Sequence, residues 1–193
     1  MRKKSYYIIN IITLYRLIMA PVLLFIIFTG NLNLFKWLLP LSFFTDLIDG
    51  YLARKFRVTS TWGAKLDSIA DDVNILVAVI ALFVFKFEFI IQEKASIIVL
   101  LVLFAVQTAL ALIRYKKISS FHTYLAKCAA MLQGVFLILV FLIPGPVYFL
   151  FYAMVIVTAI ELSEEIILVL LLPKWQANVK GIYWVLQKKT NPV

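Results

Sequence analysis

The chain has 193 residues, of which 64% are hydrophobic and only 15% are charged, and its mean hydropathy is +0.99. Soluble domains use apolar residues for roughly half of their positions, so a soluble globular protein is excluded, and the 15% of aromatic residues excludes a disordered chain. One cysteine and one histidine exclude an internal disulfide framework and a Cys-rich or His-rich metal site. The composition predicts an integral membrane protein.

Six apolar segments are long enough, at about 20 residues each, to cross a hydrocarbon core as helices. The predicted spans cover about residues 7–28, 35–52, 66–91, 95–113, 121–143 and 147–172. We therefore predict an all-α integral membrane protein with six transmembrane helices and interfacial segments at the N- and C-terminal ends. With no repeat or linker between the spans, residues 1–193 form a single predicted membrane domain.

The basic residues behind the formal net charge of +9 are distributed as a membrane topology predicts. If the spans alternate in direction, most basic residues fall on one side of the membrane: Arg2, Lys3, Lys4, Arg54, Lys55, Arg57, Lys65, Arg114, Lys116, Lys117, Lys174, Lys180, Lys188 and Lys189. The opposite loops hold only Lys36, Lys86 and Lys94. The positive-inside rule then predicts a multi-pass protein of the cell membrane with both termini in the cytoplasm. This topology explains the positive charge without a nucleic-acid partner.

The two ends of the chain add details to this topology. The first apolar run is longer than the apolar core of a secretory signal and lacks a small-residue cleavage site after it, which predicts a retained first helix. After Pro173, the residues Trp175, Val179, Ile182 and Leu186 recur at helical spacing with lysines between them. This pattern predicts a helix in the membrane interface within the tail, residues 174–193.

Five of the ten acidic residues fall between positions 46 and 72, at the end of the second span and the start of the third. Asp46 and Asp49 are three residues apart and Asp67 and Asp71 are four apart, so each pair shares one helix face. A carboxylate at membrane depth costs several kcal/mol unless it is paired or bound to a metal. Asp72 points about 100° from Asp71 and is expected to be a solvated or supporting acid.

Four converging carboxylates require counter-charge, because like charges at short range repel strongly where the dielectric constant is low. Oxygen ligands without cysteine or histidine favour Mg²⁺, Mn²⁺ or Ca²⁺ over zinc or copper. Two such metals suit phosphoryl chemistry. Between the acids, Gly50 and Ala53 leave room for a ligand, and Arg54 offers a guanidinium fork to a phosphate. The sequence thus predicts a metal-dependent phosphate site.

The stretch Asp46-Leu-Ile-Asp49-Gly50-Tyr-Leu-Ala53-Arg54, followed at fixed spacing by Gly63, Asp67 and Asp71, resembles the signature of the CDP-alcohol phosphatidyltransferase family at all eight fixed positions. That signature reads D-x-x-D-G-x-x-A-R-x8-G-x3-D-x3-D. The segment Asn10-Ile-Ile-Thr13-Leu-Tyr-Arg16 is similar to the N-x-x-T-x-x-R opening of the same family. The six-span layout extends the resemblance over most of the chain.

The resemblance implies a transferase that passes the phosphatidyl group of CDP-diacylglycerol to an alcohol and releases CMP, with Mg²⁺ or Mn²⁺ as cofactor. Asp46, Asp49, Asp67 and Asp71 would hold the metal, and Asp71 would also be the general base. The residues implied for CDP-lipid binding are Asn10, Thr13, Gly50, Ala53, Arg54 and Ser60. Arg16 is placed beside the nucleotide by the same resemblance, although it also suits a snorkelling anchor. Family members commonly form homodimers.

The acceptor alcohol is less clearly indicated. The resemblance implies that Arg114 and Lys127 bind a phosphate on the acceptor, such as inositol phosphate or glycerol 3-phosphate. The segment between these two residues is shorter than in glycerophosphate-type members, which weakens that particular assignment, and serine or other amino-alcohols stay open. His122 and Cys128 are expected to be a polar residue at a helix end and a small packing residue.

Two other functional classes fit parts of the sequence. A membrane prenyltransferase also uses aspartate-rich motifs and Mg²⁺, but with different spacing and a larger fold. A cation transporter would use intramembrane aspartates as well, but with polar residues along several spans. The motif does not explain Glu161, Glu164 and Glu165, which we expect to form structural ion pairs, with acceptor contact or a position at the cytoplasmic boundary as alternatives.

Overall fold

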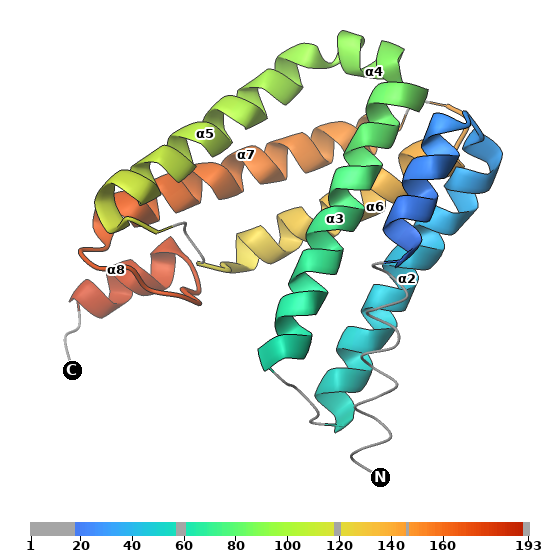
Figure 1. Ribbon diagram of the computed structural model, residues 1–193. Helices are drawn as coiled ribbons and strands as arrows, with labels where there is room; N and C mark the ends of the chain where they lie inside the picture. Colours follow the sequence, from blue (N-terminus) through green and yellow to red (C-terminus); the bar gives the residue numbers. More distant parts are fainter. Residues whose placement is uncertain (1–17, 57–60, 118–120, 146, 191–193) are drawn as a thin grey trace. The chain divides into compact units, whose positions relative to one another are not determined.

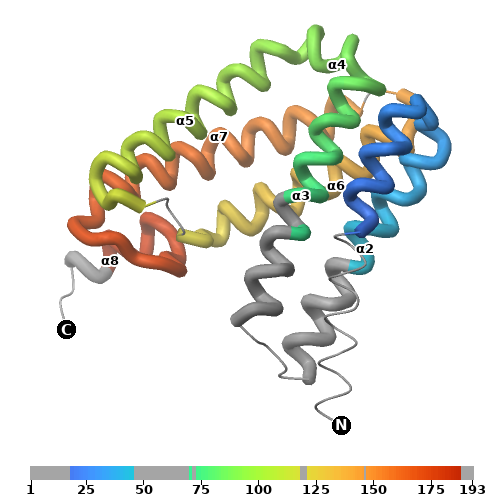
Figure 2. The backbone as a smooth tube through the Cα atoms, in the orientation of Figure 1, coloured from blue at the N-terminus to red at the C-terminus, as the bar shows by residue number. Residues whose placement is uncertain are grey.

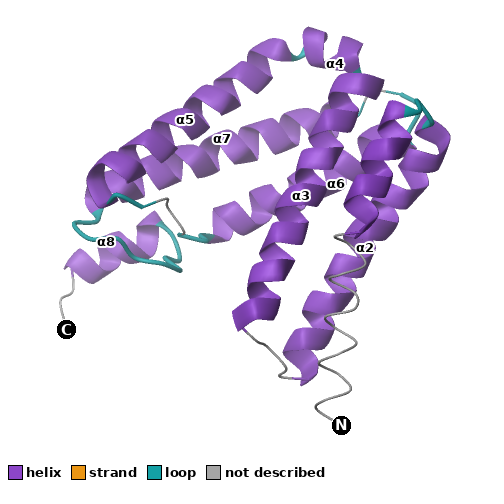
Figure 3. Ribbon diagram, in the orientation of Figure 1, coloured by secondary structure: helices purple, strands orange, loops and turns teal. Residues whose placement is uncertain are grey.

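A computed structural model describes residues 18–56, 61–117, 121–145 and 147–190; for residues 46–56, 61–69, 71, 72 and 188–190 it describes the backbone alone. All regular elements in these ranges are helices (Figure 3). After a helical stretch at Ile18–Phe28, the order is α2 (Leu32–Phe56), α3 (Thr61–Phe85), α4 (Phe87–Gln92), α5 (Lys94–Tyr115), α6 (Tyr124–Leu142), α7 (Tyr148–Leu171) and α8 (Ile182–Thr190) (Figure 1). The all-α prediction is confirmed.

The five predicted spans after the first match helices within a few residues, with one break, whereas the first ten or so residues of the first span lie outside the described residues. The third span was predicted to continue to about residue 91, but α3 ends at Phe85 and a separate short helix, α4, begins at Phe87. Lys86 lies between them. Its polar side chain interrupts an otherwise apolar run, and the N–H of Lys86 still bonds to the carbonyl of Leu82. Helix α3 is therefore 25 residues long and ends one residue before Lys86.

The chain divides into two compact units, residues 1–90 with 140–144, and residues 91–139 with 145–193. In the first unit, α2 and α3 pack together. The ring of Phe35 lies 5.6 Å from the ring of Phe85 and 5.1 Å from that of Phe141, measured between centroids. Phe35 is fully buried. The start of α2 is therefore close to the end of α3, as expected for an antiparallel helix pair.

In the second unit, α5 and α7 run parallel and side by side (Figure 2). Hydrogen bonds pair Gln92 with Tyr148 next to the start of α5 and Gln107 with Glu165 further along it, with nearly the same offset in sequence. The helix between them, α6, runs antiparallel to α7, because Gln133 bonds to Thr158 while the later Phe136 contacts the earlier Phe151. This up-down-up order is the one that alternating spans require.

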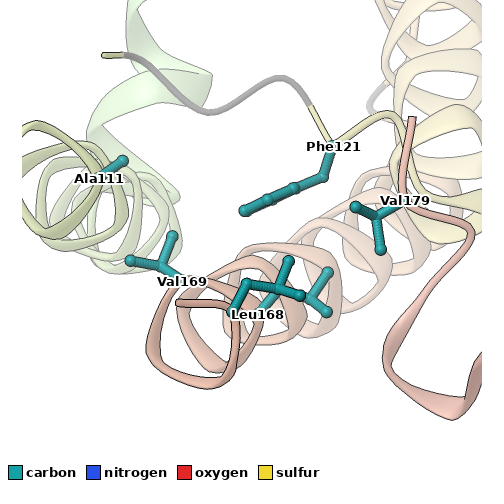
Figure 4. Packing of buried hydrophobic residues seen from close by; sticks show 6 residues of the cluster. Ala111, Phe121, Leu168, Val169 and Val179 are labelled. Atoms are coloured by element: carbon teal, nitrogen blue, oxygen red, sulfur yellow. The ribbon is translucent and has the colours of Figure 1, made fainter. Parts of the chain in front are cut away.

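An apolar cluster closes one end of the second unit. It joins the last turns of α5 and α7 to the segments before α6 and α8: Ala111, Phe121, Leu168, Val169, Leu172 and Val179. Figure 4 shows Phe121 directed between α5 and α7. The hydroxyl of Tyr115 donates to the carbonyls of Val169 and Leu172, at 3.0 and 2.8 Å. These bonds satisfy acceptors that the end of a helix otherwise leaves unpaired.

The tail differs from the prediction. We expected a helix that includes Trp175 and Val179, but α8 begins only at Ile182. The reason is the backbone: Asn178 has φ of 57° and Gly181 has φ of 148°, values outside the helical region. A Cβ on Gly181 would lie 3.0 Å from Glu164 Oε1. Instead of one interfacial helix, a loop folds back onto the ends of α5 and α7 before a short helix leads to the C-terminus.

Two of the described helices, α5 and α6, are long and apolar enough to cross a membrane. Only 11% and 28% of their apolar windows are buried, whereas the core helix of a soluble protein would be mostly buried. Their outer faces present large apolar side chains, including Leu101, Phe104 and Met131. Such faces fit a lipid environment.

Candidate active site

Helix α2 carries a buried stripe that leads to the first half of the motif. Phe35, Leu39 and Ser42 are almost completely buried and follow one another at spacings of four and three residues. The same alternation of three and four places Asp46 and Asp49 next on the stripe. Both positions lie within the continuous α2 helix. The Asp-x-x-Asp spacing therefore continues a packing face that begins three turns earlier.

Helix α3 carries a similar buried stripe, but on this helix the motif positions precede the buried residues in the sequence. Ala81, Ala78 and Asn74 are buried, with 2% or less of each side chain exposed. Moving back along the helix by three and seven residues from Asn74 reaches Asp71 and Asp67, which are both inside α3. Residues at these spacings share a helix face. The second half of the motif thus also extends a buried face.

A buried hydrogen bond sets the register between the two stripes. The hydroxyl of Ser42 donates to Asn74 Oδ1 at 3.1 Å. Asp49 lies seven residues beyond Ser42 and Asp67 lies seven residues before Asn74, so both Cα positions are about 10 Å along their helix axes from this bond at 1.5 Å per residue. In an antiparallel pair these two positions reach the same level. The backbone therefore brings the two halves of the motif to one end of the α2–α3 pair.

Only some of the other predicted site residues lie in the described part of the chain. Gly50, Ala53 and Arg54 lie in the last two turns of α2, beyond the aspartates, and their backbone is helical. The remaining residues predicted to bind the CDP-lipid lie outside the described residues: Asn10, Thr13 and Ser60, together with the neighbouring Arg16.

The two predicted acceptor-binding residues lie at one end of the second unit. Arg114 is in the last turn of α5 and Lys127 in the first turn of α6, and both are exposed. The Lys127 ammonium is 5.5 Å from the centroid of the Tyr124 ring. At the same end, the Lys117 ammonium is 5.2 Å from the ring of Trp175. This end is therefore rich in both positive charge and aromatic rings, as expected at a membrane–water interface.

Two of the three glutamates of α7 accept hydrogen bonds from neutral donors. Gln107 Nε2 donates to Glu165 Oε2 at 2.6 Å, and the backbone N–H of Ile182 donates to Glu164 Oε1 at 3.1 Å. Glu161 and Glu165 are each 9% exposed. The ion pairs expected here stay a prediction, and the sequence signal that we missed is Gln107, a lone amide in an apolar span. Among the described side chains, no group of three His, Cys, Asp or Glu is placed to hold a metal ion.

Comparison with known proteins adds to this geometry. The model of the CDP-alcohol phosphatidyltransferase family matches residues 6–164, which include both motif helices and all eight signature positions. The chain belongs to the CDP-alcohol phosphatidyltransferase family. The match ends within α7, so the loop after α7 and helix α8 lie outside the matched residues.

The chain is similar to several curated proteins that are named as phosphatidyltransferases. A CDP-diacylglycerol–glycerol-3-phosphate 3-phosphatidyltransferase of Haemophilus influenzae is 34% identical over 92 residues, covering 46% of this chain and 49% of the relative. An enzyme of the same name from Rickettsia typhi is 28% identical over 64% of this chain and 70% of the relative. A probable CDP-diacylglycerol–inositol 3-phosphatidyltransferase of Arabidopsis thaliana is 40% identical over 35% of this chain and 30% of the relative.

These alignments have limited extent. The chain spans about half the length of the Haemophilus relative and less than a third of the Arabidopsis relative. No solved structure matches the chain.

Proposed function

We propose that this protein transfers the phosphatidyl group of CDP-diacylglycerol to an alcohol and releases CMP, as a step of phospholipid biosynthesis. The observation that carries the proposal is the α2–α3 register. The Ser42–Asn74 bond and the two buried stripes direct the two halves of an eight-position family signature to one end of one helix pair. The names of the relatives support the same reaction type.

Asp46, Asp49, Asp67 and Asp71 are the proposed metal ligands. Their donor set fits Mg²⁺ or Mn²⁺, since both ions prefer carboxylate oxygens, and four carboxylates on facing stripes need positive charge to lie close together. A bound divalent ion would offset the charge of the pyrophosphate during phosphoryl transfer. The fit therefore rests on the chemistry of the donors and on the register of the helices that carry them.

Asp71 is the proposed general base. It would accept the proton of the acceptor hydroxyl as that oxygen forms a new bond to the phosphorus of the phosphatidyl group. The bond between this phosphorus and the bridging oxygen of CMP breaks, and CMP leaves with the electron pair. Asp71 suits the role because, of the two signature aspartates on α3, it is the one nearer to the middle of the helix.

The CDP-lipid would lie beside the last turns of α2. Arg54 offers two parallel N–H groups to a phosphate, and Gly50 and Ala53 are small enough for the nucleotide to approach the helix backbone. Ser60, Asn10 and Thr13 are proposed to complete this binding site on the strength of the family resemblance.

The proposed acceptor carries a phosphate. Arg114 and Lys127 are exposed cations at one end of the second unit, and the names of the relatives include glycerol 3-phosphate and inositol as acceptors. We propose a phosphorylated polyol, such as inositol phosphate or glycerol 3-phosphate. Lysine and arginine both bind phosphate oxygens through charge-assisted hydrogen bonds.

We further propose six spans in the cell membrane, with both termini and the active site on the cytoplasmic side, and a homodimer as the assembly. The apolar outer faces of α5 and α6 and the parallel run of α5 and α7 support alternating spans. The basic residues at the Arg114 and Lys127 end support the orientation. In this proposal residues 1–193 are one membrane domain whose tail, 174–193, lies in the interface.

The test of the reaction is CMP release by the purified protein in detergent, with CDP-diacylglycerol, Mg²⁺ or Mn²⁺, and a panel of alcohols. We expect release that requires one acceptor class and is lost in Asp71→Asn. Release without any acceptor would indicate hydrolysis. Turnover of a prenyl pyrophosphate, or metal flux into vesicles without CMP release, would favour a prenyltransferase or a cation transporter and overturn the proposal.

A further inference from the structure

Ser42 and Asn74 form a buried polar pair on two otherwise apolar helix faces. Their side chains are 1% and 2% exposed, and the hydrogen bond between them measures 3.1 Å. Neighbours on the same stripes, Leu39, Val77 and Ala78, are apolar and equally buried. Apolar residues of the same shape can replace such a pair at little cost in stability. Packing alone therefore gives no reason for a hydroxyl and an amide at this level.

The position of the pair relative to the motif suggests the reason. Ser42 is one turn before Asp46 on α2, and Asn74 is one turn after Asp71 on α3. The Ser42–Asn74 hydrogen bond therefore joins α2 to α3 within one turn of a motif aspartate on each helix. A polar contact between helices fixes one register, whereas apolar faces can slide or rotate against each other.

The Asn74 side chain carries donors as well as an acceptor. Its Oδ1 accepts the bond from Ser42, and an asparagine amide has two N–H donors besides. Groups of this kind, one layer outside a metal site, commonly orient the ligating carboxylates, and their loss costs metal affinity. Neither Ser42 nor Asn74 belongs to the eight signature positions.

We propose that Ser42 and Asn74 are positioning residues for the metal-binding carboxylates: the hydrogen bond fixes the register of α2 and α3, and the Asn74 amide orients a carboxylate one turn away. The inference rests on the proposed function, because it assumes that the motif carboxylates hold a divalent ion. It adds two residues outside the signature to the active site.

The test is equilibrium binding of Mn²⁺ to the full chain in detergent, followed by the electron paramagnetic resonance signal of free Mn²⁺, with CMP release as a second measurement. Asn74→Leu should weaken Mn²⁺ binding about tenfold or more, the range found for partners that orient metal ligands. Ser42→Ala should weaken it as well, and the double variant should lose little more than Asn74→Leu, because both changes break one interaction. Ser42→Thr keeps the hydroxyl and should restore binding.

The second unit offers a matched control. Gln133 Nε2 donates to Thr158 Oγ1, also at 3.1 Å, in another amide–hydroxyl pair between two helices. Gln133→Leu should leave Mn²⁺ affinity unchanged. Equal loss of affinity in Gln133→Leu and Asn74→Leu, or wild-type affinity in both Asn74→Leu and Ser42→Ala, would overturn the inference. If Asn74→Leu does not fold, the difference between Ser42→Ala and Ser42→Thr decides.

The design separates this inference from the proposed function. A wild-type protein that binds Mn²⁺ but releases no CMP with any acceptor contradicts the reaction, and the Mn²⁺ affinities of the variants still test the positioning role. A wild-type protein that does not bind Mn²⁺ overturns both. A wild-type protein that binds Mn²⁺ and releases CMP, with unaltered affinity in the variants, overturns the positioning role alone.

Discussion

Each unit contains a pair of helices with basic residues near one end, but the other residues at that end differ between the units: they are apolar in the second unit and include aspartates in the first. In the second unit, α5 and α7 converge on an apolar cluster around the fully buried Phe121, and Tyr115 satisfies the last carbonyls of α7. In the first unit, the buried stripes of α2 and α3 continue into positions that hold aspartates. An apolar end is stable by itself, whereas an end that gathers carboxylates needs a cation. The contrast supports our proposal that the first unit holds the metal ion, whereas this end of the second unit is held by apolar packing.

The largest expected effect is in the first unit. Asp71→Asn removes the proposed base but keeps the shape of the side chain, so CMP release should fall by about 100-fold or more. Binding of CDP-diacylglycerol should be largely retained, because a base is lost more than a ligand. Asp67→Asn is the matched change at a metal ligand, and it should weaken Mn²⁺ and substrate binding. Equal loss of substrate binding in the two variants would refute the separate roles.

The next effect concerns the acceptor. Lys127→Ala should raise the KM for the phosphorylated acceptor about tenfold, since a charge-assisted hydrogen bond contributes roughly 1.5–3 kcal/mol. The KM for CDP-diacylglycerol should stay the same. Lys117→Ala removes a cation at the same end of the unit, where Lys117 lies over Trp175, and serves as the control. The assignment fails if both variants raise the acceptor KM equally.

A smaller effect, on stability alone, is expected in the loop after α7. Gly181 has φ of 148°, and a Cβ there would lie 3.0 Å from Glu164 Oε1. Gly181→Ala should therefore destabilise the second unit by about 1 kcal/mol or more, seen as a lower midpoint of thermal unfolding in detergent. Gly134 lies within α6, with nothing within 4 Å of an added Cβ. Gly134→Ala should leave the midpoint unchanged or raise it, and a drop equal to that of Gly181→Ala would contradict the explanation.

The smallest effect is expected at the cap of α7. Tyr115→Phe removes the hydroxyl that donates to Val169 and Leu172 and should cost about 1 kcal/mol. Tyr183→Phe, at an exposed ring of α8, should cost nothing measurable in the same thermal unfolding experiment. Neither change should alter the Mn²⁺ dependence of CMP release. A shift in that dependence for Tyr115→Phe would show that this cap also affects metal binding.

The sequence predicts much of this molecule because apolar length and charge dominate it. The five spans after the first coincide with helices within a few residues, apart from the break at Lys86. The tail helix was predicted too long, although Asn178 and Gly181, residue types that tolerate positive φ, were visible in the sequence.

The supporting polar pairs could not be predicted in the same way. Ser42–Asn74 and Gln107–Glu165 join residues 32 and 58 positions apart. Helical periodicity assigns each residue to a face but does not say which face of another helix it meets. For the signature aspartates, by contrast, the spacing of three and four residues was sufficient to place each pair on one face, and the structure adds the register between the pairs.

The proposed metal site requires that Asp49 on α2 and Asp67 on α3 lie at the same level of the helix pair. Disulfide cross-linking tests it directly, in a Cys128→Ala background because Cys128 is the only cysteine. A disulfide requires Cα atoms within about 7 Å of each other. Asp49→Cys with Asp67→Cys should cross-link readily under mild oxidation. Tyr51→Cys with Lys65→Cys, at a similar level but about 200° away on each helix, should not. Cross-linking of the second pair in preference to the first would contradict the register, and with it the proposed metal site.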